Sequence, residues 1–234
     1  MEFQKLTSPS LRELFVRQLV DMILSGNLAV GEQLPPEREL AETMQVSRAV
    51  VNGGIAELAR KGFLLVKPRV GAFVADYRYN GTIETFTAIM NYNGGRFRDA
   101  EIRSILELRV ALDILAVQLQ IPRVTDAEVE VLREKTEGIR AAKSDAEAAE
   151  CAFAFQHELA IQSENTLLPL IFSSFKVPVH TLWLRFCALY GAGALYENTY
   201  TLWDRIRARD IDGAVAWINR SVEDSISGDR SIYY

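Results

Sequence analysis

The stretch PPERELAETMQVSRAVVNGGIAELARKGFLLV, residues 35–66, decides the fold of the first part of this chain. Pro36 suits the first turn of a short helix, where its fixed φ and missing N–H cost nothing. After a brief connection, Ser47 suits the N-cap of a second helix, and Gly62 suits its end. Two helices joined this closely predict a helix-turn-helix.

Segments on both sides of this stretch complete a small domain. Before it, apolar residues recur every three to four positions from Leu11 to Leu24, which predicts an amphipathic helix. After it, FLLV and GAFVADY are two short β-type runs, and Pro68 and Gly71 allow a tight reversal between them. Three helices and a hairpin predict a winged helix-turn-helix domain over residues 1–77. Its expected core residues are Leu40, Met44, Val46, Val51, Ile55 and Leu58.

From Thr82 onward, strand signals disappear and helical periodicity takes over. The pattern predicts an all-α bundle of six or seven helices over residues 78–234, so the fold class is mainly α with one small β-hairpin. The join near residues 77–81 is too short for a free linker, so we expect the two domains to keep a restricted geometry. The expected helices cover residues 83–90, 100–120, 126–143, 145–162, 166–191, 195–209 and 210–226.

Composition limits the partners and the compartment. The formal net charge of the 234 residues is -5, so any binding to nucleic acid requires a local basic face. Cys151 and Cys187 lie in apolar helical contexts, which predicts small buried thiols in a reducing compartment rather than a disulfide. We find no secretory leader and no apolar run long enough to span a membrane. These features predict a cytoplasmic protein without a membrane partner.

The second helix of the helix-turn-helix begins with Ser47 and Arg48. Small or basic side chains at this end of a recognition helix reach base edges and phosphates in the major groove. Arg38 on the preceding helix, and Lys67 and Arg69 at the hairpin tip, would flank the same face and contact the phosphate backbone. The alternative for Arg48, Lys67 and Arg69 is an ordinary solvated cation.

This pattern closely resembles the N-terminal domain of GntR-type bacterial transcription regulators. The family pattern "LP.ERELAE...VSR..V...I..L...G", followed by "G.FV", recurs here over residues 34–74. The resemblance implies that Arg38, Ser47 and Arg48 contact operator DNA. It also implies that the hairpin around Gly71, the wing, approaches the minor groove.

One segment departs from the family pattern. Where the family usually has VREAL, this chain has VNGGI, so Asn52 replaces a DNA-contacting arginine. An asparagine at this position can read adenine or simply face water. Because Asn52 replaces this arginine, we expect an operator sequence that differs from the usual one. Gly53 and Gly54 each weaken the helix by about 1 kcal/mol relative to alanine.

The helical part resembles the effector-binding and dimerisation domain of the FadR branch of this family. The resemblance rests on EIRSILELRVALDILAVQL, FQHELAIQSENTLL and LWDRIRARDIDGAVAWI. It implies a homodimer that reads a short pseudo-palindromic operator in double-stranded DNA, with repression as the expected mode. Nothing in the sequence indicates whether an effector releases or promotes DNA binding.

Much of this branch holds a divalent metal through an aspartate and three histidines, with the aspartate four residues before one histidine. In this chain His157 stands at the histidine position, but Phe153 stands at the aspartate position. Tyr200 and Ser221 stand where the other ligands would be. One imidazole does not make a metal site, so we expect no metal and no other cofactor.

These replacements make the cavity more apolar, which suits a small hydrophobic ligand. Family members without the metal include regulators that sense long-chain acyl-coenzyme A, so the leading effector is an acyl-CoA or another apolar carboxylate. The guanidinium of Arg109 can clamp such an acid group, or it can pair with Asp113 at i+4. The expected effector-binding residues are Arg109, Phe153, His157, Tyr200 and Trp203.

Other classes of function fit less well. The chain has two histidines and lacks a Gly-rich phosphate loop, an H-E-x-x-H motif and a G-x-S-x-G motif, so we expect no enzyme and no catalytic residue. Two alternatives remain. One is a metal-dependent sensor of a small polar carboxylate in the same family. The other is a helical protein-interaction module whose winged helix docks on protein, which the salt dependence of DNA binding would distinguish.

Overall fold

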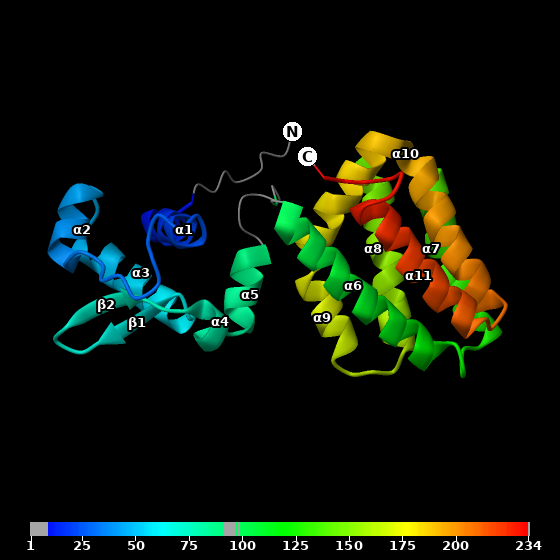
Figure 1. The fold of residues 1–234 in the computed structure, drawn as a ribbon, viewed down its shortest axis with the longest axis horizontal. Coiled ribbons are helices and arrows are strands. Elements are labelled where there is room, and N and C mark those ends of the chain that lie inside the picture. Colours follow the sequence, from blue (N-terminus) through cyan, green and yellow to red (C-terminus); the bar gives the residue numbers. More distant parts are fainter. Residues whose placement is uncertain (1–8, 91–96, 98, 234) are drawn as a thin grey trace, which may run out of the picture. The chain divides into compact units, whose positions relative to one another are not determined.

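The computed structural model describes residues 9–90, 97 and 99–233 (Figure 1). The chain divides into two compact units, Met1–Tyr92 and Asn93–Tyr234. The boundary expected at residue 77 lies earlier than this division, because residues 78–92 group with the first unit. None of the helices in the described ranges combines the length and apolar character that a membrane crossing requires.

The first unit contains the predicted winged helix-turn-helix. Helix α1 (Leu11–Leu24) begins at a capping box, in which the Ser10 hydroxyl accepts a hydrogen bond from the backbone N–H of Glu13. Helices α2 (Glu37–Thr43) and α3 (Arg48–Arg60) follow, and Ser47 caps α3 as expected. Strands β1 (Leu64–Lys67) and β2 (Gly71–Val74) pair antiparallel to form the wing.

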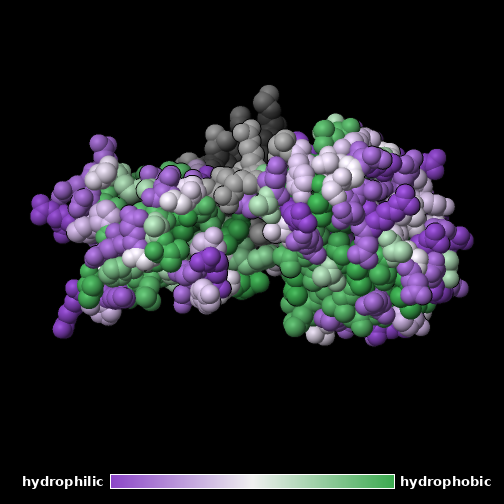
Figure 2. Space-filling view, viewed as in Figure 1, coloured by the Kyte–Doolittle hydropathy of each residue, from purple (hydrophilic) through white to green (hydrophobic). Residues whose placement is uncertain are grey.

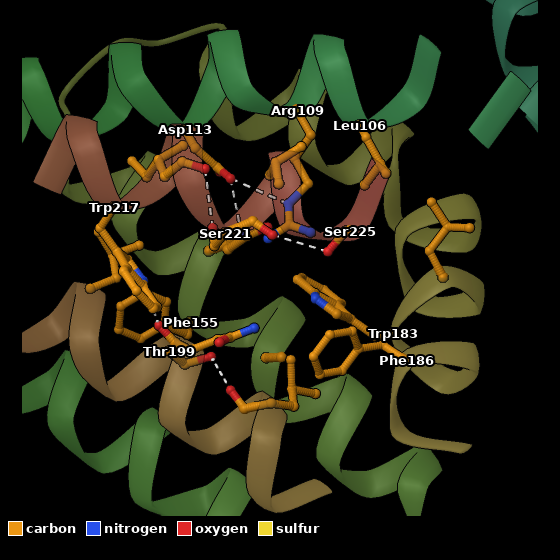
Figure 3. A pocket seen from close by; sticks show the side chains of 18 of the residues that line it. Leu106, Arg109, Asp113, Phe155, Trp183, Phe186, Thr199, Trp217, Ser221 and Ser225 are labelled. Carbon is orange, nitrogen blue, oxygen red and sulfur yellow. Dashed lines mark hydrogen bonds and ion pairs between the residues drawn. The ribbon is translucent and has the colours of Figure 1, made fainter. Parts of the chain in front are cut away.

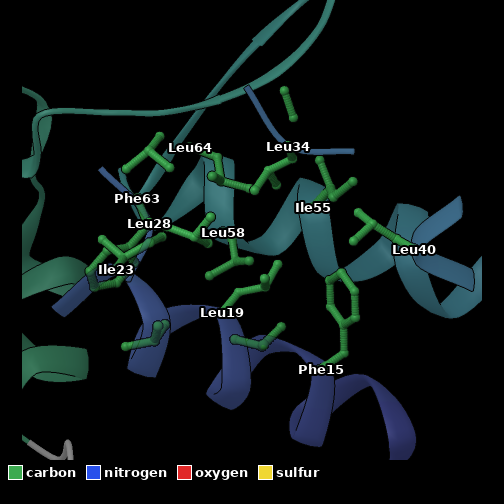
Figure 4. Close-up of a cluster of buried hydrophobic side chains, with 14 of the residues drawn as sticks. Phe15, Leu19, Ile23, Leu28, Leu34, Leu40, Ile55, Leu58, Phe63 and Leu64 are labelled. Atoms are coloured by element: carbon green, nitrogen blue, oxygen red, sulfur yellow. The ribbon is translucent and has the colours of Figure 1, made fainter. Parts of the chain in front are cut away.

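The core of the first unit lies between α1, α3 and the wing (Figure 4). Phe15 on α1 meets α3 at Gly54, where an added Cβ would lie 2.3 Å from the ring. The VNGGI segment therefore has a packing reason, since only glycine lets α1 and α3 approach this closely. Of the expected core residues, Met44 and Val46 are partly buried, and four are buried: Leu40, Val51, Ile55 and Leu58.

Two further helices, α4 (Tyr77–Asn80) and α5 (Ile83–Met90), pack against the end of α3. The Thr85 hydroxyl donates to the carbonyl of Lys61, and Arg60 pairs with Glu84. Gly62 has a φ of 73°, and an added Cβ there would lie 2.6 Å from the carbonyl oxygen of Asn80. The sequence predicted α5, but not the short helix α4.

The second unit is all-α, as predicted (Figure 1). Helices α7, α8 and α10 pack against one another, and α11 packs against α6 and α10. Both cysteines are free, and burial raises the pKa of the Cys187 thiol to about 11. The helices are α6 (Asp99–Gln120), α7 (Asp126–Ala141), α8 (Asp145–Gln162), α9 (Leu168–Ser174), α10 (Lys176–Arg207) and α11 (Ile211–Ile226).

One expected helix is divided differently in the structure. Residues 166–191 were expected to form a single helix, but Phe175 separates α9 from α10. Helix α10 then continues to Arg207 across a kink at Gly191, whose φ of 81° and ψ of 155° are not helical. Glycine adopts this positive φ readily, so the kink does not carry the strain that a larger residue would bring.

Candidate functional site

The N-terminus of α3 forms the centre of the candidate DNA interface. Ser47 and Arg48 are both exposed. The Ser47 hydroxyl accepts a hydrogen bond from the backbone N–H of Val50 at 3.3 Å, which fixes the start of the helix. No hydrogen bond or ion pair holds the Arg48 guanidinium to the described part of the chain. This cation is therefore available to an external anion.

Two polar side chains near this end are already engaged. The Nε of Arg38 donates to Oε1 of Glu42 at 2.8 Å, and both side chains remain mostly exposed. The Nδ2 of Asn52 lies 3.4 Å from each carboxylate oxygen of Glu37. Contact of Asn52 with a base would thus replace a weak, exposed contact with α2.

The wing carries two exposed cations. Arg69 lies at its tip with a φ of 63°, and Lys67 Nζ lies 4.7 Å from the centroid of the Phe73 ring. The Gln33 amide donates to the carbonyl of Val70 at 2.9 Å, and an added Cβ at Gly71 would lie 2.7 Å from this amide nitrogen. The wing is therefore held against the loop before α2, and Gly71 permits the close approach.

The second unit contains a cavity of about 60 Å³ (Figure 3). Helix α6 contributes Arg109 and Asp113 to its lining, and residue Ile232 beyond α11 also lines it. The Ile232 backbone carbonyl accepts a hydrogen bond from Arg185 Nε at 2.6 Å. The aromatic and small polar lining residues from α8, α10 and α11 include Phe155, Gln156, Trp183, Phe186, Thr199, Trp217, Ser221 and Ser225.

A buried ion pair forms the polar centre of this cavity. Asp113 Oδ2 accepts hydrogen bonds from Arg109 Nε at 3.2 Å and from Gln156 Nε2 at 3.1 Å. The Arg109 guanidinium also lies 4.7 Å from the Trp183 ring centroid. Arg109 thus forms the expected pair with Asp113 and also lines the cavity, and its contact with the acid group of a ligand stays a prediction.

Burial controls the chemistry of Asp113. Its side chain is almost fully buried, and this desolvation raises the pKa of the carboxyl to about 6 against the opposing effects of Arg109 and Gln156. Its second oxygen, Oδ1, has no hydrogen-bond partner among the described residues. A buried carboxylate oxygen without a donor is costly, so the pair is incompletely satisfied.

The other four expected effector residues do not line this cavity. Phe153 lines a separate, smaller hollow between α6, α8, α9 and α10. His157 Nε2 lies 3.0 Å from the Ser173 hydroxyl, and the Tyr200 side chain is exposed. Trp203 is buried, and its indole N–H donates to the carbonyl of Val129 at 3.1 Å. Of the five expected effector residues, Arg109 is the one that lines this cavity.

Three lining residues, Ala152, Gln156 and Thr199, sit one position before the expected Phe153, His157 and Tyr200 on the same helices. Ser221, named above at a possible ligand position, also lines the cavity. One position rotates a side chain by about 100° around a helix, which moves it to another face. Phe155 and Leu159 are both fully buried, and this apolar spacing on α8 was the signal that could have located the inward face.

These lining residues do not fit a metal site of one aspartate and three histidines. Ala152 offers a methyl group, and Gln156 gives its amide N–H to Asp113. The hydroxyls of Thr199 and Ser221 donate to carbonyls of their own helices. The described lining contains no imidazole, and no three His, Cys, Asp or Glu side chains gather elsewhere in the described ranges. Amide and hydroxyl oxygens are poor substitutes for histidine on a transition metal.

Comparison with known proteins agrees with both halves of this architecture. Residues 11–74 match the family described as bacterial regulatory proteins, gntR family, and residues 104–224 match the FCD domain. The HTH-type transcriptional regulator LutR of Bacillus subtilis is 26% identical over 88% of this chain and 97% of its own length. A fatty acid metabolism regulator protein of Shewanella denitrificans is 27% identical over 68% of this chain and 65% of its own length.

A solved structure is similar in fold. The Lar protein, described as controlling the Listeria monocytogenes agr system, has a TM-score of 0.62 and 16% identity over 93% of this chain and 95% of its own length. The FCD match alone covers more than half of the chain. The chain therefore belongs to the gntR family of bacterial regulatory proteins and is a transcription regulator with an effector-binding FCD domain, not an enzyme.

Proposed function

We propose that this regulator binds a specific operator in double-stranded DNA as a homodimer, and that a small organic carboxylate in the FCD cavity controls the binding. The first unit, Met1–Tyr92, would act as the DNA-binding domain, and the second unit, Asn93–Tyr234, as the effector and dimerisation domain. The observation that carries the proposal is the exposed, unpaired Arg48 at the start of α3 in a chain whose formal net charge is -5.

The proposed roles at the interface follow from exposure and partners. Arg48 and Ser47 reach into the major groove, where an arginine can contact guanine through two hydrogen bonds. Arg38, Lys67 and Arg69 contact phosphates, and they set position rather than sequence preference. Gly71 lets the wing approach the backbone of the minor groove, and Asn52 contributes to base preference.

An exposed apolar face supports the homodimer. This face consists of exposed apolar residues on α6, on α9 and just before α9. Hydrophobic side chains gather on the side of the second unit that these two helices form (Figure 2). Leu112 and Phe172 line one hollow, so α6 and α9 are neighbours. Large exposed apolar patches mark interaction sites on soluble proteins. The exposed residues are Leu108, Leu115, Leu167, Leu170 and Ile171.

The size of the cavity limits the effector. A volume of about 60 Å³ gives room for about four to six water molecules. The long chain of an acyl-CoA exceeds this, so the proposal takes the smaller member of the expected class, a short carboxylate with an apolar part. Arg109 would hold the acid group, and Trp183 and Phe155 would surround the apolar part. Repression is the proposed mode because it is the one expected for this family.

One experiment tests the DNA-binding proposal. The protein is used to select duplexes from a random pool, and the affinity for the enriched sequence is measured by fluorescence anisotropy at several salt concentrations. A palindromic site with a steep loss of affinity in salt is expected, since each phosphate contact contributes a slope of about -0.9. Absence of enrichment, or a nearly flat salt dependence, would instead indicate a module that docks on protein.

A further inference from the structure

The charges around the cavity balance one another. The described lining carries one cation, Arg109, and one anion, Asp113. A simple monocarboxylate would leave this site with a net negative charge beside the buried Asp113, which is costly. A ligand that carries both signs leaves the site neutral. Charge balance therefore favours a zwitterion over a simple acid.

The hydrogen-bonding capacity of the lining points the same way. The hydroxyls of Thr199, Ser221 and Ser225 donate their protons to carbonyls of their own helices. Each hydroxyl oxygen can therefore only accept a hydrogen bond from a ligand in the cavity. Asp113 Oδ1 is a further acceptor without a donor. The two terminal amino groups of Arg109 are charged donors from which no described residue accepts a hydrogen bond, and Trp183 and Asn198 add neutral N–H donors to the lining. The site thus offers one charged donor group beside several acceptors.

From these observations we propose that the ligand of the FCD cavity is a small amino acid. Its carboxylate binds the terminal amino groups of Arg109, and its ammonium group donates to Asp113 Oδ1 and to hydroxyl oxygens of α10 and α11. Its side chain lies among Phe155, Trp183 and Phe186. This inference rests on the proposed function, because it names the chemical class of the effector at that same site.

Tryptophan fluorescence gives a direct test, because Trp183 and Trp217 both line the cavity. The full-length protein is titrated with glycine, L-alanine, L-serine, L-valine and β-alanine. Whichever amino acid binds best is compared with its hydroxy acid, its deaminated acid and its decarboxylated amine; for L-alanine these are L-lactate, propionate and ethylamine. The amino acid is expected to bind at least about tenfold more tightly than each analogue, since each analogue loses one charge-assisted contact in a buried site.

A matched pair of variants locates the ammonium group. Asp113→Asn is nearly isosteric and should weaken binding of the amino acid at least about tenfold, while the deaminated acid should bind more tightly, because Arg109 then balances its carboxylate. Asp204→Asn is the control, because Asp204 pairs with Arg207 at 2.6 Å and Arg207 lies 5.4 Å from the Trp203 ring, outside the cavity. The control variant should bind the amino acid like the unmodified protein.

The outcomes separate this inference from the proposed function. Equal or tighter binding of the hydroxy acid or the deaminated acid would overturn the amino-acid inference and leave a small carboxylate as the effector. Absence of binding by all five amino acids would also overturn it, and so would full affinity in Asp113→Asn. A failure of the proposed function would show instead in the operator selection, which requires no ligand.

Discussion

The two units of this regulator place an arginine in opposite surroundings. Arg48 in the first unit is exposed and holds no partner in the described chain, whereas Arg109 in the second unit is mostly buried against Asp113 and Trp183. An exposed cation keeps its water until a polyanion replaces it, and it contributes little to folding. A buried pair interacts more strongly, but each partner depends on the other. In the proposed function, the same side chain would serve recognition of a long polymer in one unit and of a small molecule in the other.

The largest expected effect is on stability and separates these two arginines. Arg109→Ala leaves the Asp113 carboxylate buried without its charged partner, so the free energy of unfolding should fall by about 3 kcal/mol at neutral pH. Arg48→Ala removes an exposed side chain and should change it by less than about 0.5 kcal/mol. Urea denaturation of both variants checks this. Equal losses of unfolding free energy in the two variants would mean that the buried Arg109 contributes no more to stability than the exposed Arg48.

A second prediction concerns pH. The pKa of Asp113 rises from 3.8 to about 6 on folding, so the folded state binds this proton more tightly than the unfolded state does. Protonation of Asp113 therefore stabilises the folded state fully below pH 4, and this stabilisation is lost as the pH rises to 6. The loss amounts to about 3 kcal/mol, from about 1.4 kcal/mol for each pKa unit.

Asp113→Asn isolates this effect from other carboxyls, several of which have lowered pKa values that act in the opposite direction. The free energy of unfolding of the variant minus that of the unmodified protein should increase between pH 4 and 6. Urea denaturation at several pH values measures it. A difference that stays constant across this range would show that Asp113 titrates normally.

A third prediction addresses the packing that supports Arg48. Gly54→Ala forces a methyl group against the Phe15 ring and should reduce the free energy of unfolding by about 1–3 kcal/mol. Gly53→Ala is the matched control, because its Cβ would meet only the flexible side chain of Arg12, at 3.2 Å. That variant should gain up to about 1 kcal/mol from helix propensity. Thermal denaturation distinguishes the two, and the reverse order would contradict the packing of α1 on α3.

A fourth prediction concerns base recognition. Arg48→Ala should weaken binding to the selected operator by about 1–3 kcal/mol and relax the preference at one base position. Anisotropy with a set of single-base operator variants measures both effects. Unchanged binding would show that α3 lies in the groove in another register.

The smallest expected effect belongs to the wing. Lys67→Ala should weaken binding to all sequences by a similar factor and reduce the slope of log affinity against log salt by about 1. The same titrations with an unrelated duplex provide the comparison. A loss confined to the selected operator would assign Lys67 to base recognition instead of phosphate contact.

The first unit could be predicted more completely than the second because its signals are local. Ser10 and Ser47 cap their helices through hydrogen bonds to residues three positions away, so short stretches of sequence were sufficient. The close approach of Gly54 and Phe15 depends on packing between distant segments. The glycine pair therefore looked like a weakness of the helix until its neighbour was known.

The cavity shows where local signals are insufficient. Arg109 was found from its position on α6, but the inward face of α8 was displaced by one residue, so Phe153 and His157 were expected where Ala152 and Gln156 lie. Which residue of a neighbouring pair faces inward depends on the rotation of α8 within the bundle. Phe155 and Leu159 indicate that rotation, but other apolar residues occur on most of the circumference of α8 and weaken the signal.

The attachment of α5 to α3 has a mechanical consequence. Thr85 and Glu84 bind the last residues of α3, and Gly62 leaves no space between α3 and α4. We therefore expect α5 and α3 to move as one body, so that a displacement of α5 also displaces Arg48 at the other end of α3.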